Sequence, residues 1–336
     1  IGCHYMATWI EPHTQTFTQM GGEGCTWIGQ APFTSEQHVF ANLGDGTYFH
    51  SGLMAIRAAI AAKVNITYKI LYNDAVAMTG GQHVDGYLDV PMLTRQLAAE
   101  GVKRIVITTD EPEKYQGVQG LAAGVEVFHR RELEQLQQQL RAIAGTTILI
   151  HDQTCAAEKR RRRKRGNYPD PAKRAFINHR VCEGCGDCGK TSQCLSVLPL
   201  ETPLGRKRTI DQSSCNKDFS CVDGYCPSFV TVEGGQLKKN GQKSRPSLND
   251  MPPLPLPPLP STQQPYGIMV TGVGGTGVVT IGQILGVAAH LDGLGISVLD
   301  MAGLAQKGGS VWSHIRLADQ QDKLHAVRIA AGDANV

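Results

Sequence analysis

Residues 39–46 read Val-Phe-Ala-Asn-Leu-Gly-Asp-Gly, and residues 66–75 read Ile-Thr-Tyr-Lys-Ile-Leu-Tyr-Asn-Asp-Ala. Each stretch is an apolar, strand-like run that ends in a polar cluster. Leu53, Ile56 and Ile60 lie between them at helical spacing, so this segment is predicted to form a strand, a tight Gly turn, a helix and a second strand. In a parallel sheet both polar clusters would lie at the carboxyl ends of their strands, where such folds bind ligands.

The residues at these two strand ends match the oxygen ligands that Mg²⁺ prefers. Asp45 offers a carboxylate, Asn73 an amide oxygen and Ala75 a backbone carbonyl, which leaves further positions for the oxygens of a diphosphate. Gly44 and Gly46 would let the backbone approach the phosphates without an intervening Cβ. An ordinary Gly-Asp-Gly turn is the alternative, but the Asn-Asp pair on the next strand favours the magnesium site.

These residues resemble the thiamine-diphosphate domain of the 2-oxoacid:ferredoxin oxidoreductases, and most closely that of the fused indolepyruvate ferredoxin oxidoreductases. The likeness lies in residues 1–4, 19–24, 44–52 and 73–82. It implies that thiamine diphosphate and its magnesium contact twelve residues: Gly2, Cys3, His4, Gly44, Asp45, Gly46, Thr47, Asn73, Ala75, Met78, Thr79 and Gly80.

The α/β alternation continues after residue 82. Helices are predicted at 91–101 and 130–143, and strands at 104–108 and 146–150. This alternation predicts an α/β domain with a mostly parallel, doubly wound sheet over residues 1–152.

Size and composition limit the number of domains and the classes of protein to which the chain can belong. A chain of 336 residues should contain two or three domains, and a net charge of +3 is too small to indicate a nucleic-acid-binding protein. The sequence has neither a run of eighteen apolar residues nor a signal peptide, so we expect a cytoplasmic chain without a membrane span. Seven of the ten cysteines lie between Cys182 and Cys226, and such clustering favours metal binding over disulfides.

Residues 153–180 are predicted to be a basic linker, because residues 159–165 are seven consecutive cations. Nucleic-acid binding is an alternative that the nearly neutral chain disfavours. We expect the run to dock an acidic electron carrier or a neighbouring acidic surface, with an attraction that weakens in salt.

The cysteine cluster begins with Cys182, Cys185 and Cys188, whose two-residue intervals are typical of ligands to a [4Fe-4S] cluster. In two-cluster ferredoxins the fourth ligand comes from a distant Cys-Pro, and Cys226 before Pro227 fits that role. Zinc is the alternative metal, although zinc ribbons use paired Cys-x2-Cys halves.

A second cluster would use Cys194, Cys215 and Cys221, but Asp218 stands where the middle cysteine is expected. The second site is therefore a [4Fe-4S] cluster with a carboxylate ligand, a [3Fe-4S] cluster, or no cluster. Residues 181–189 and 213–235 also resemble the ferredoxin region of the fused oxidoreductases, which implies a ferredoxin-like insert over residues 181–235.

A Pro-rich linker is predicted over residues 236–265, because its prolines favour an extended, semi-rigid chain. Residues 266–336 then start a Rossmann-like domain with strands at 268–271 and 296–299 around a Gly-rich turn and a helix. Gly272, Gly274 and Gly277 fit a dinucleotide fingerprint, and Asp300 fits the ribose contact.

The same turn, including Gly275, and residues 301–309 also resemble the gamma domain of the 2-oxoacid:ferredoxin oxidoreductases. We prefer this interpretation to NAD binding, because three matching modules in one chain arise by accident less easily than one Gly-rich turn. It implies that the loop faces the active site or coenzyme A, and that the domain is incomplete within this chain.

The resemblance implies that a 2-oxoacid is oxidatively decarboxylated to an acyl-CoA, with electrons passing through the clusters to ferredoxin. Indolepyruvate or another aryl pyruvate is the expected substrate, and pyruvate or a branched-chain 2-oxoacid is the alternative. A thiamine-dependent decarboxylase without electron transfer is disfavoured by the clustered cysteines, and a non-catalytic redox adaptor by Gly44–Gly46 and Asn73.

The resemblance also implies a partner for this chain. The glutamate that activates thiamine sits on a pyrimidine domain that resembles nothing here. We therefore expect the rest of the polypeptide or a partner subunit to supply it, a homo-oligomeric assembly, and no activity from the chain alone.

Overall fold

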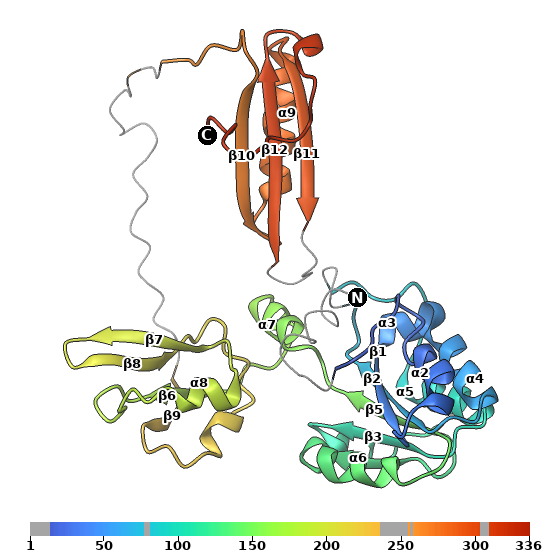
Figure 1. Cartoon of the computed structure of the whole chain (residues 1–336). Helices are drawn as coiled ribbons and strands as arrows, with labels where there is room; N and C mark the ends of the chain where they lie inside the picture. The colour runs from blue at the N-terminus through green and yellow to red at the C-terminus, as the bar shows by residue number, and fades with distance from the viewer. Residues whose placement is uncertain (1–13, 77–80, 236–254, 256–257, 303–308) are drawn as a thin grey trace. The chain divides into compact units, whose positions relative to one another are not determined.

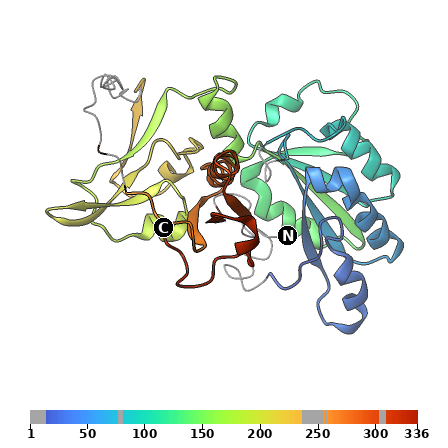
Figure 2. The same ribbon diagram turned by 90° about the horizontal axis from the view of Figure 1, so that it is seen from above.

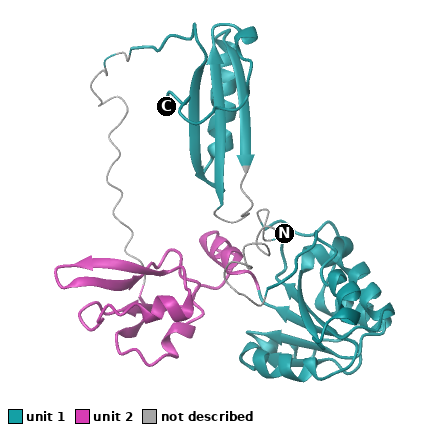
Figure 3. Cartoon of the chain, viewed as in Figure 1, with its two compact units in different colours: residues 1–153, 254–336 teal, residues 154–253 magenta. Residues whose placement is uncertain are grey.

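The computed structural model describes residues 14–76, 81–235, 255, 258–302 and 309–336. The chain divides into two compact units, residues 1–153 with 254–336 and residues 154–253 (Figure 3). The described strands form a five-stranded sheet near the N-terminus, a three-stranded sheet near the C-terminus and two two-stranded sheets between them. No helix among the described residues has the length and apolarity that crossing a membrane requires.

The N-terminal sheet has the order β1-β2-β5-β3-β4, and all its neighbouring strands are parallel (Figure 1). Its strands are β1 (Val39–Gly44), β2 (Ile66–Tyr72), β3 (Ile105–Thr109), β4 (Glu126–His129) and β5 (Thr146–Asp152). The predicted α/β domain with a parallel sheet is therefore confirmed. Parallel pairing places the ends of β1 and β2 side by side, as Gly44 pairs with Leu71.

Helices cover both faces of this sheet (Figure 2). They are α2 (Cys25–Gln30), α4 (Leu53–Ala61), α5 (Val90–Ala99) and α6 (Leu133–Arg141). Successive residues of β5 point to opposite faces, so Ile148 and Ile150 join one core with Ile56 of α4 and Leu93 of α5. The intervening Leu149 packs with Leu140 of α6 in a second core.

The 154–253 unit is built around a small core of four buried residues, Ala175, Ile177, Cys182 and Ile210. Strand β6 (Lys173–Ile177) pairs with β9 (Phe229–Glu233), and β7 (Val197–Thr202) pairs with β8 (Gly205–Ile210), both antiparallel. Its helices are α7 (Ala156–Lys164) and α8 (Asp187–Ser192). Since β6 lies within 153–180, part of the predicted linker belongs to the same sheet as the segment that follows the cysteines.

The basic run forms most of helix α7, although cations in sequence repel one another. Glu158 in its first turn offsets this repulsion, because its buried carboxylate pairs with Arg161 at 2.5 Å and with Arg162 at 3.2 Å. These are the three- and four-residue spacings at which helical side chains meet.

The C-terminal sheet consists of β10 (Tyr266–Val273), β11 (Gly295–Ala302) and β12 (Ser310–Ala318), and α9 (Val278–Leu291) packs on it (Figure 1). The predicted strand, Gly turn, helix and strand are present. However, β12 lies between β10 and β11 and runs antiparallel to both, so the described sheet differs from the parallel pair expected of a Rossmann-like unit.

Candidate cofactor sites

Asp45 lies where β1 ends, as the first residue of the short helix α3 (Asp45–Thr47), and its side chain is buried. One carboxylate oxygen accepts the Gly46 N–H at 2.8 Å, and the other accepts the N–H groups of Asn73 and Asp74 at 2.9 and 3.1 Å. Burial raises the pKa of Asp45, and these three backbone hydrogen bonds oppose that rise. The ends of β1 and β2 are thus joined through one carboxylate.

Asn73 and Ala75 complete the predicted magnesium ligands at this edge. The Asn73 side-chain oxygen is buried and has no hydrogen-bond partner within the part of the chain that the structure describes. Such an atom is costly unless something binds it, and a cation would satisfy it. Asp74 between them has a φ of +58°, an uncommon conformation that recurs at functional sites. The donor set therefore fits Mg²⁺, for which Asp45, Asn73 and the Ala75 carbonyl would supply oxygens.

A pocket of about 280 Å³ opens beside Asp45. Two of its lining residues, Asp45 and Ala75, are predicted magnesium ligands. The others are Tyr72, Asp74, His83, Val84, Gly86, Tyr87, Leu88 and Asp89. Most belong to an irregular segment whose far end is held by hydrogen bonds: Tyr72 donates to the Leu88 carbonyl at 3.0 Å, and Asp89 accepts the Met92 N–H at 2.7 Å as the N-cap of α5.

The chain that follows Asp45 is also irregular. Residues Tyr48–Gly52 form a π-helical turn before α4, a feature often found near functional sites. The loop at residues 19–24 packs against this turn, because a Cβ at Gly21 would lie 1.9 Å from Ser51 Oγ. Among the residues that the resemblance assigned to the cofactor, Gly2, Cys3, His4, Met78, Thr79 and Gly80 lie outside the described residues.

Three predicted ligands of the first cluster lie between the end of β6 and the first turn of α8: Cys182 and Cys185 precede α8, and Cys188 is its second residue. Gly184 and Gly186 have φ values of +78° and +84°, which turn the backbone between successive cysteines. Burial raises the pKa of the Cys188 thiol, and the charges of Cys182 and Cys185 raise it further, so the three thiols lie within electrostatic range.

Cys226 lies on a segment next to the one that carries Cys182. The Asn178 carbonyl accepts the Cys182 N–H at 2.9 Å, and the Asn178 N–H donates to the Ser228 carbonyl at 2.8 Å. Cys226 Sγ in turn lies 3.0 Å from Ser228 Oγ. All four predicted ligands of the first cluster therefore lie on neighbouring segments.

The second predicted set also lies together. Burial raises the pKa of one of its thiols, that of Cys221. Charges on the other members, Cys215, Asp218 and Cys194, raise the same pKa further. Every described cysteine is a free thiol, as iron–sulfur ligation requires.

Within the described ranges, no three His, Cys, Asp or Glu side chains are placed to hold one metal ion together. A mononuclear zinc site needs such a group around a single point. The thiolates of a cubane cluster each bind a different iron, so they are not required to converge in that way.

In the C-terminal sheet, Gly275 and Gly277 of the Gly-rich turn have φ values of +87° and +90°, and Gly277 is the N-cap of α9. Asp300 lies within β11, opposite Ser313 of β12, rather than beyond the strand end. That position differs from the strand-end carboxylate of a dinucleotide site.

Two family models match the chain. The thiamine pyrophosphate enzyme C-terminal TPP-binding domain matches residues 1–151, and the pyruvate ferredoxin/flavodoxin oxidoreductase domain matches residues 267–336. Indolepyruvate oxidoreductase subunit IorA of Thermococcus kodakarensis is 27% identical over 259 residues, which are 72% of this chain and 37% of that protein. The chain is indolepyruvate oxidoreductase-like. Subunit IorA of Pyrococcus abyssi is 27% identical over 201 residues, which are 59% of this chain and 29% of that protein.

The chain is also similar to the other subunit of these enzymes. Subunit IorB of Archaeoglobus fulgidus is 41% identical over 69 residues, which are 20% of this chain and 32% of that protein. The chain thus spans about a third of the length of each curated relative. A solved structure of a thiamin diphosphate-dependent enzyme from Mycobacterium smegmatis is 20% identical in sequence, and the alignment covers 38% of this chain and 20% of the chain of that enzyme. Its TM-score of 0.27 is too low to bear on the fold.

Proposed function

We propose that the chain is the diphosphate-binding and electron-accepting part of a thiamine-diphosphate-dependent 2-oxoacid:ferredoxin oxidoreductase that acts on indolepyruvate or another aryl pyruvate. The observation that carries this proposal lies at the carboxyl edge of the sheet, where the buried Asp45 carboxylate accepts the Asn73 N–H and the buried Asn73 side-chain oxygen has no hydrogen-bond partner among the described residues. Similarity to both IorA and IorB supports the choice of reaction and substrate.

The chain's own residues hold and orient the cofactor in this proposal. Asp45, Asn73 and the Ala75 carbonyl hold Mg²⁺, and Gly44 and Gly46 admit the diphosphate to the backbone. When bound, thiamine diphosphate supplies the decarboxylation chemistry, and iron–sulfur clusters supply single-electron acceptors. Cys182, Cys185, Cys188 and Cys226 hold the first cluster.

The same proposal assigns roles to the second cysteine set, to the C-terminal residues and to the partners of the chain. The 181–235 segment is the ferredoxin-like insert, with a second cluster on Cys194, Cys215, Asp218 and Cys221. Residues 266–336 are part of a gamma domain whose Gly-rich turn, at Gly272, Gly274, Gly275 and Gly277, faces the active site or coenzyme A. Ferredoxin accepts the electrons, and a pyrimidine domain elsewhere in the assembly supplies the activating glutamate.

Metal analysis tests the electron-accepting half of the proposal. We expect anaerobically prepared protein to contain about four irons with matching sulfide for one cubane, and about seven or eight if the second set is occupied. An electron paramagnetic resonance spectrum of the oxidised protein separates a three-iron site from a cubane. Zinc without sulfide would remove the electron-transfer step and leave a thiamine-dependent decarboxylase as the better assignment.

A further inference from the structure

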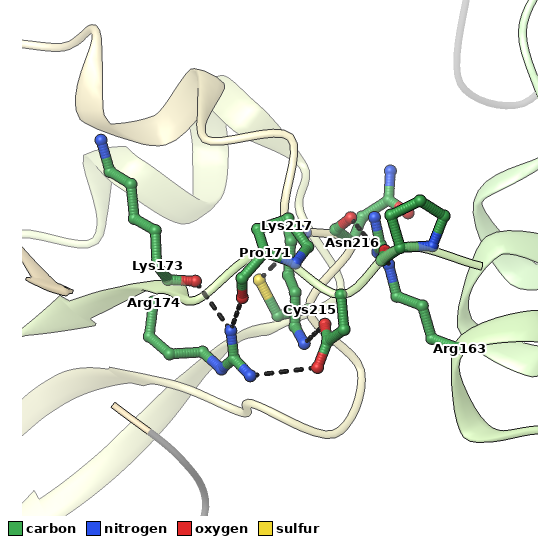
Figure 4. Close-up of polar contacts among 9 residues, drawn as sticks. Arg163, Pro171, Lys173, Arg174, Cys215, Asn216 and Lys217 are labelled. Atoms are coloured by element: carbon green, nitrogen blue, oxygen red, sulfur yellow. Dashed lines mark hydrogen bonds and ion pairs between the residues drawn. The ribbon is translucent and has the colours of Figure 1, made fainter. Parts of the chain in front are cut away.

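A set of polar contacts ties the second cysteine loop to the segment that follows the basic helix (Figure 4). Lys217 Nζ, on a side chain only 11% exposed, makes an ion pair with Asp170. Asp170 is also held by Arg174, at 3.1 Å from Nη2. Arg163 of α7 donates to the Asn216 carbonyl at 2.7 Å, and its guanidinium stacks 5.3 Å from the Tyr168 ring centroid. Contacts from outside the loop therefore hold both residues that separate Cys215 from Asp218.

The backbone of this loop is unusual at the same place. Lys217 and Phe219 have φ values of +56° and +60°, in the left-handed region that residues other than glycine rarely adopt. In this conformation the Lys217 N–H donates to Cys215 Sγ at 3.4 Å. A strained turn of this kind persists only where its surroundings hold it. Asp170 holds Lys217 and Arg163 holds Asn216, and these are the two residues between Cys215 and Asp218.

We propose that Asp170, supported by Arg163, is a positioning residue for the second cysteine set: by holding Lys217 it keeps the Lys217 N–H directed at Cys215 Sγ. The inference rests on the proposed function, in which this set carries an iron–sulfur cluster. A hydrogen bond to a ligating sulfur favours the reduced, more negative state of a cluster. The network therefore raises the reduction potential of the second cluster and leaves the first unaffected.

This proposal also gives part of the basic run a role within the unit. Arg163 contacts the cysteine loop, while Arg161 and Arg162 pair with Glu158. These three members of the seven-cation run therefore have partners within residues 154–253. The segment 163–174 acts as a strap on the second cysteine loop.

Two variants of opposite charge change test the network. Asp170→Asn removes a negative charge and Lys217→Gln removes a positive one. The matched controls are Glu201→Gln and Arg206→Gln, because Glu201 and Arg206 form an exposed ion pair at 2.5 Å on the β7–β8 hairpin of the same unit. Asp170→Glu is the conservative rescue.

The first measurement is hydrogen exchange of the peptide that spans residues 213–221, in the full chain. We expect exchange about tenfold faster or more in Asp170→Asn and Lys217→Gln, little change in either control, and recovery in Asp170→Glu. Unchanged exchange in both variants would overturn the proposal.

The second measurement is a redox titration of both clusters, followed by electron paramagnetic resonance. Positioning predicts that both variants lower the potential of the second cluster, since both release the Lys217 N–H. Charge acting through space predicts opposite shifts, and that result would overturn the proposal. A wild-type chain without iron and sulfide would overturn the proposed function together with this inference, whereas two clusters whose potentials do not move would overturn the inference alone.

Discussion

In the N-terminal domain, Asp45 and Asn73 follow two parallel strands that pack into a core of fifteen buried residues. The clustered cysteines of the 154–253 unit instead lie on loops and short helical turns, and the core of that unit contains only four buried residues. The first site is held by hydrogen bonds from the Asn73 and Asp74 N–H groups to the Asp45 carboxylate. The second depends on left-handed turns at Gly184, Gly186 and Lys217 and on ion pairs. The topology of the sheet therefore preforms the first site, whereas the order of the second site depends on what its thiols bind.

Removal of iron should have the largest effect, and it should act on the 154–253 unit alone. We expect chelation of the iron in air to speed proteolytic cleavage within residues 181–235 about tenfold or more, because the small core of that unit cannot replace the lost metal bonds. The N-terminal sheet should keep its resistance. Limited proteolysis with mass spectrometry measures both regions in one sample, and equal loss of resistance in both would contradict the comparison.

Mild acid should instead destabilise the N-terminal domain, through the buried His38. Burial, followed by the charge of Arg141, lowers the pKa of His38 to about 4, and its Nε2 lies 2.8 Å from Thr67 Oγ1 at the start of the sheet. The folded state therefore binds a proton on His38 less well than the unfolded state, in which the pKa of histidine has its ordinary value of 6.5. The stabilising contribution of the neutral ring is therefore complete above pH 6.5 and is lost as the pH falls toward 4.

At pH 5 this linkage should cost the N-terminal domain roughly 2 kcal/mol relative to pH 7.5. Denaturant unfolding of wild type and His38→Gln at the two pH values measures it, and the variant should lose most of this pH dependence. An equal pH dependence in both proteins would show that His38 does not titrate as proposed. The hydrogen exchange of residues 181–235 serves as the internal reference.

The smallest effect concerns the cations of α7 that remain exposed. Lys164 and Arg165 lie at its solvent-facing end. If they steer an acidic electron carrier, Lys164→Gln with Arg165→Gln should slow cluster oxidation by ferredoxin a few-fold at low ionic strength and have no effect in high salt. Stopped-flow absorbance measures the rate, with Arg206→Gln as the matched control, and a loss that persists in high salt would exclude steering.

Much of the N-terminal domain could be predicted from sequence, because its apolar runs are strongly periodic. Strand β2 begins at residue 66, where the predicted strand-like run begins, and β5 extends only two residues beyond its predicted end. Strand β4 was missed because it is a short, half-buried edge strand. The proposed magnesium ligands could be selected from sequence because Gly44–Gly46 and Asn73–Ala75 follow two consecutive strands.

The rest depends on packing that leaves no periodic signal. The pocket wall at residues 83–89 is irregular, and single contacts such as that of Tyr72 with the Leu88 carbonyl hold it. The helix in the basic run was missed because seven consecutive cations indicate a linker. The burial of the Glu158 carboxylate, which offsets their repulsion, leaves no signal in the sequence. The antiparallel β12 between β10 and β11 could not be inferred from a Gly-rich turn and two strands.

In the proposed function, Asp45 and Asn73 form a magnesium-dependent diphosphate site. Calorimetric titration of thiamine diphosphate into the chain, with Mg²⁺ and with a chelator, tests it most directly. We predict binding that requires Mg²⁺ and weakens roughly 100-fold or more in Asp45→Asn, with no change in the control Glu134→Gln, an exposed carboxylate on α6. Binding that is equally tight without Mg²⁺, or in Asp45→Asn, would contradict the account.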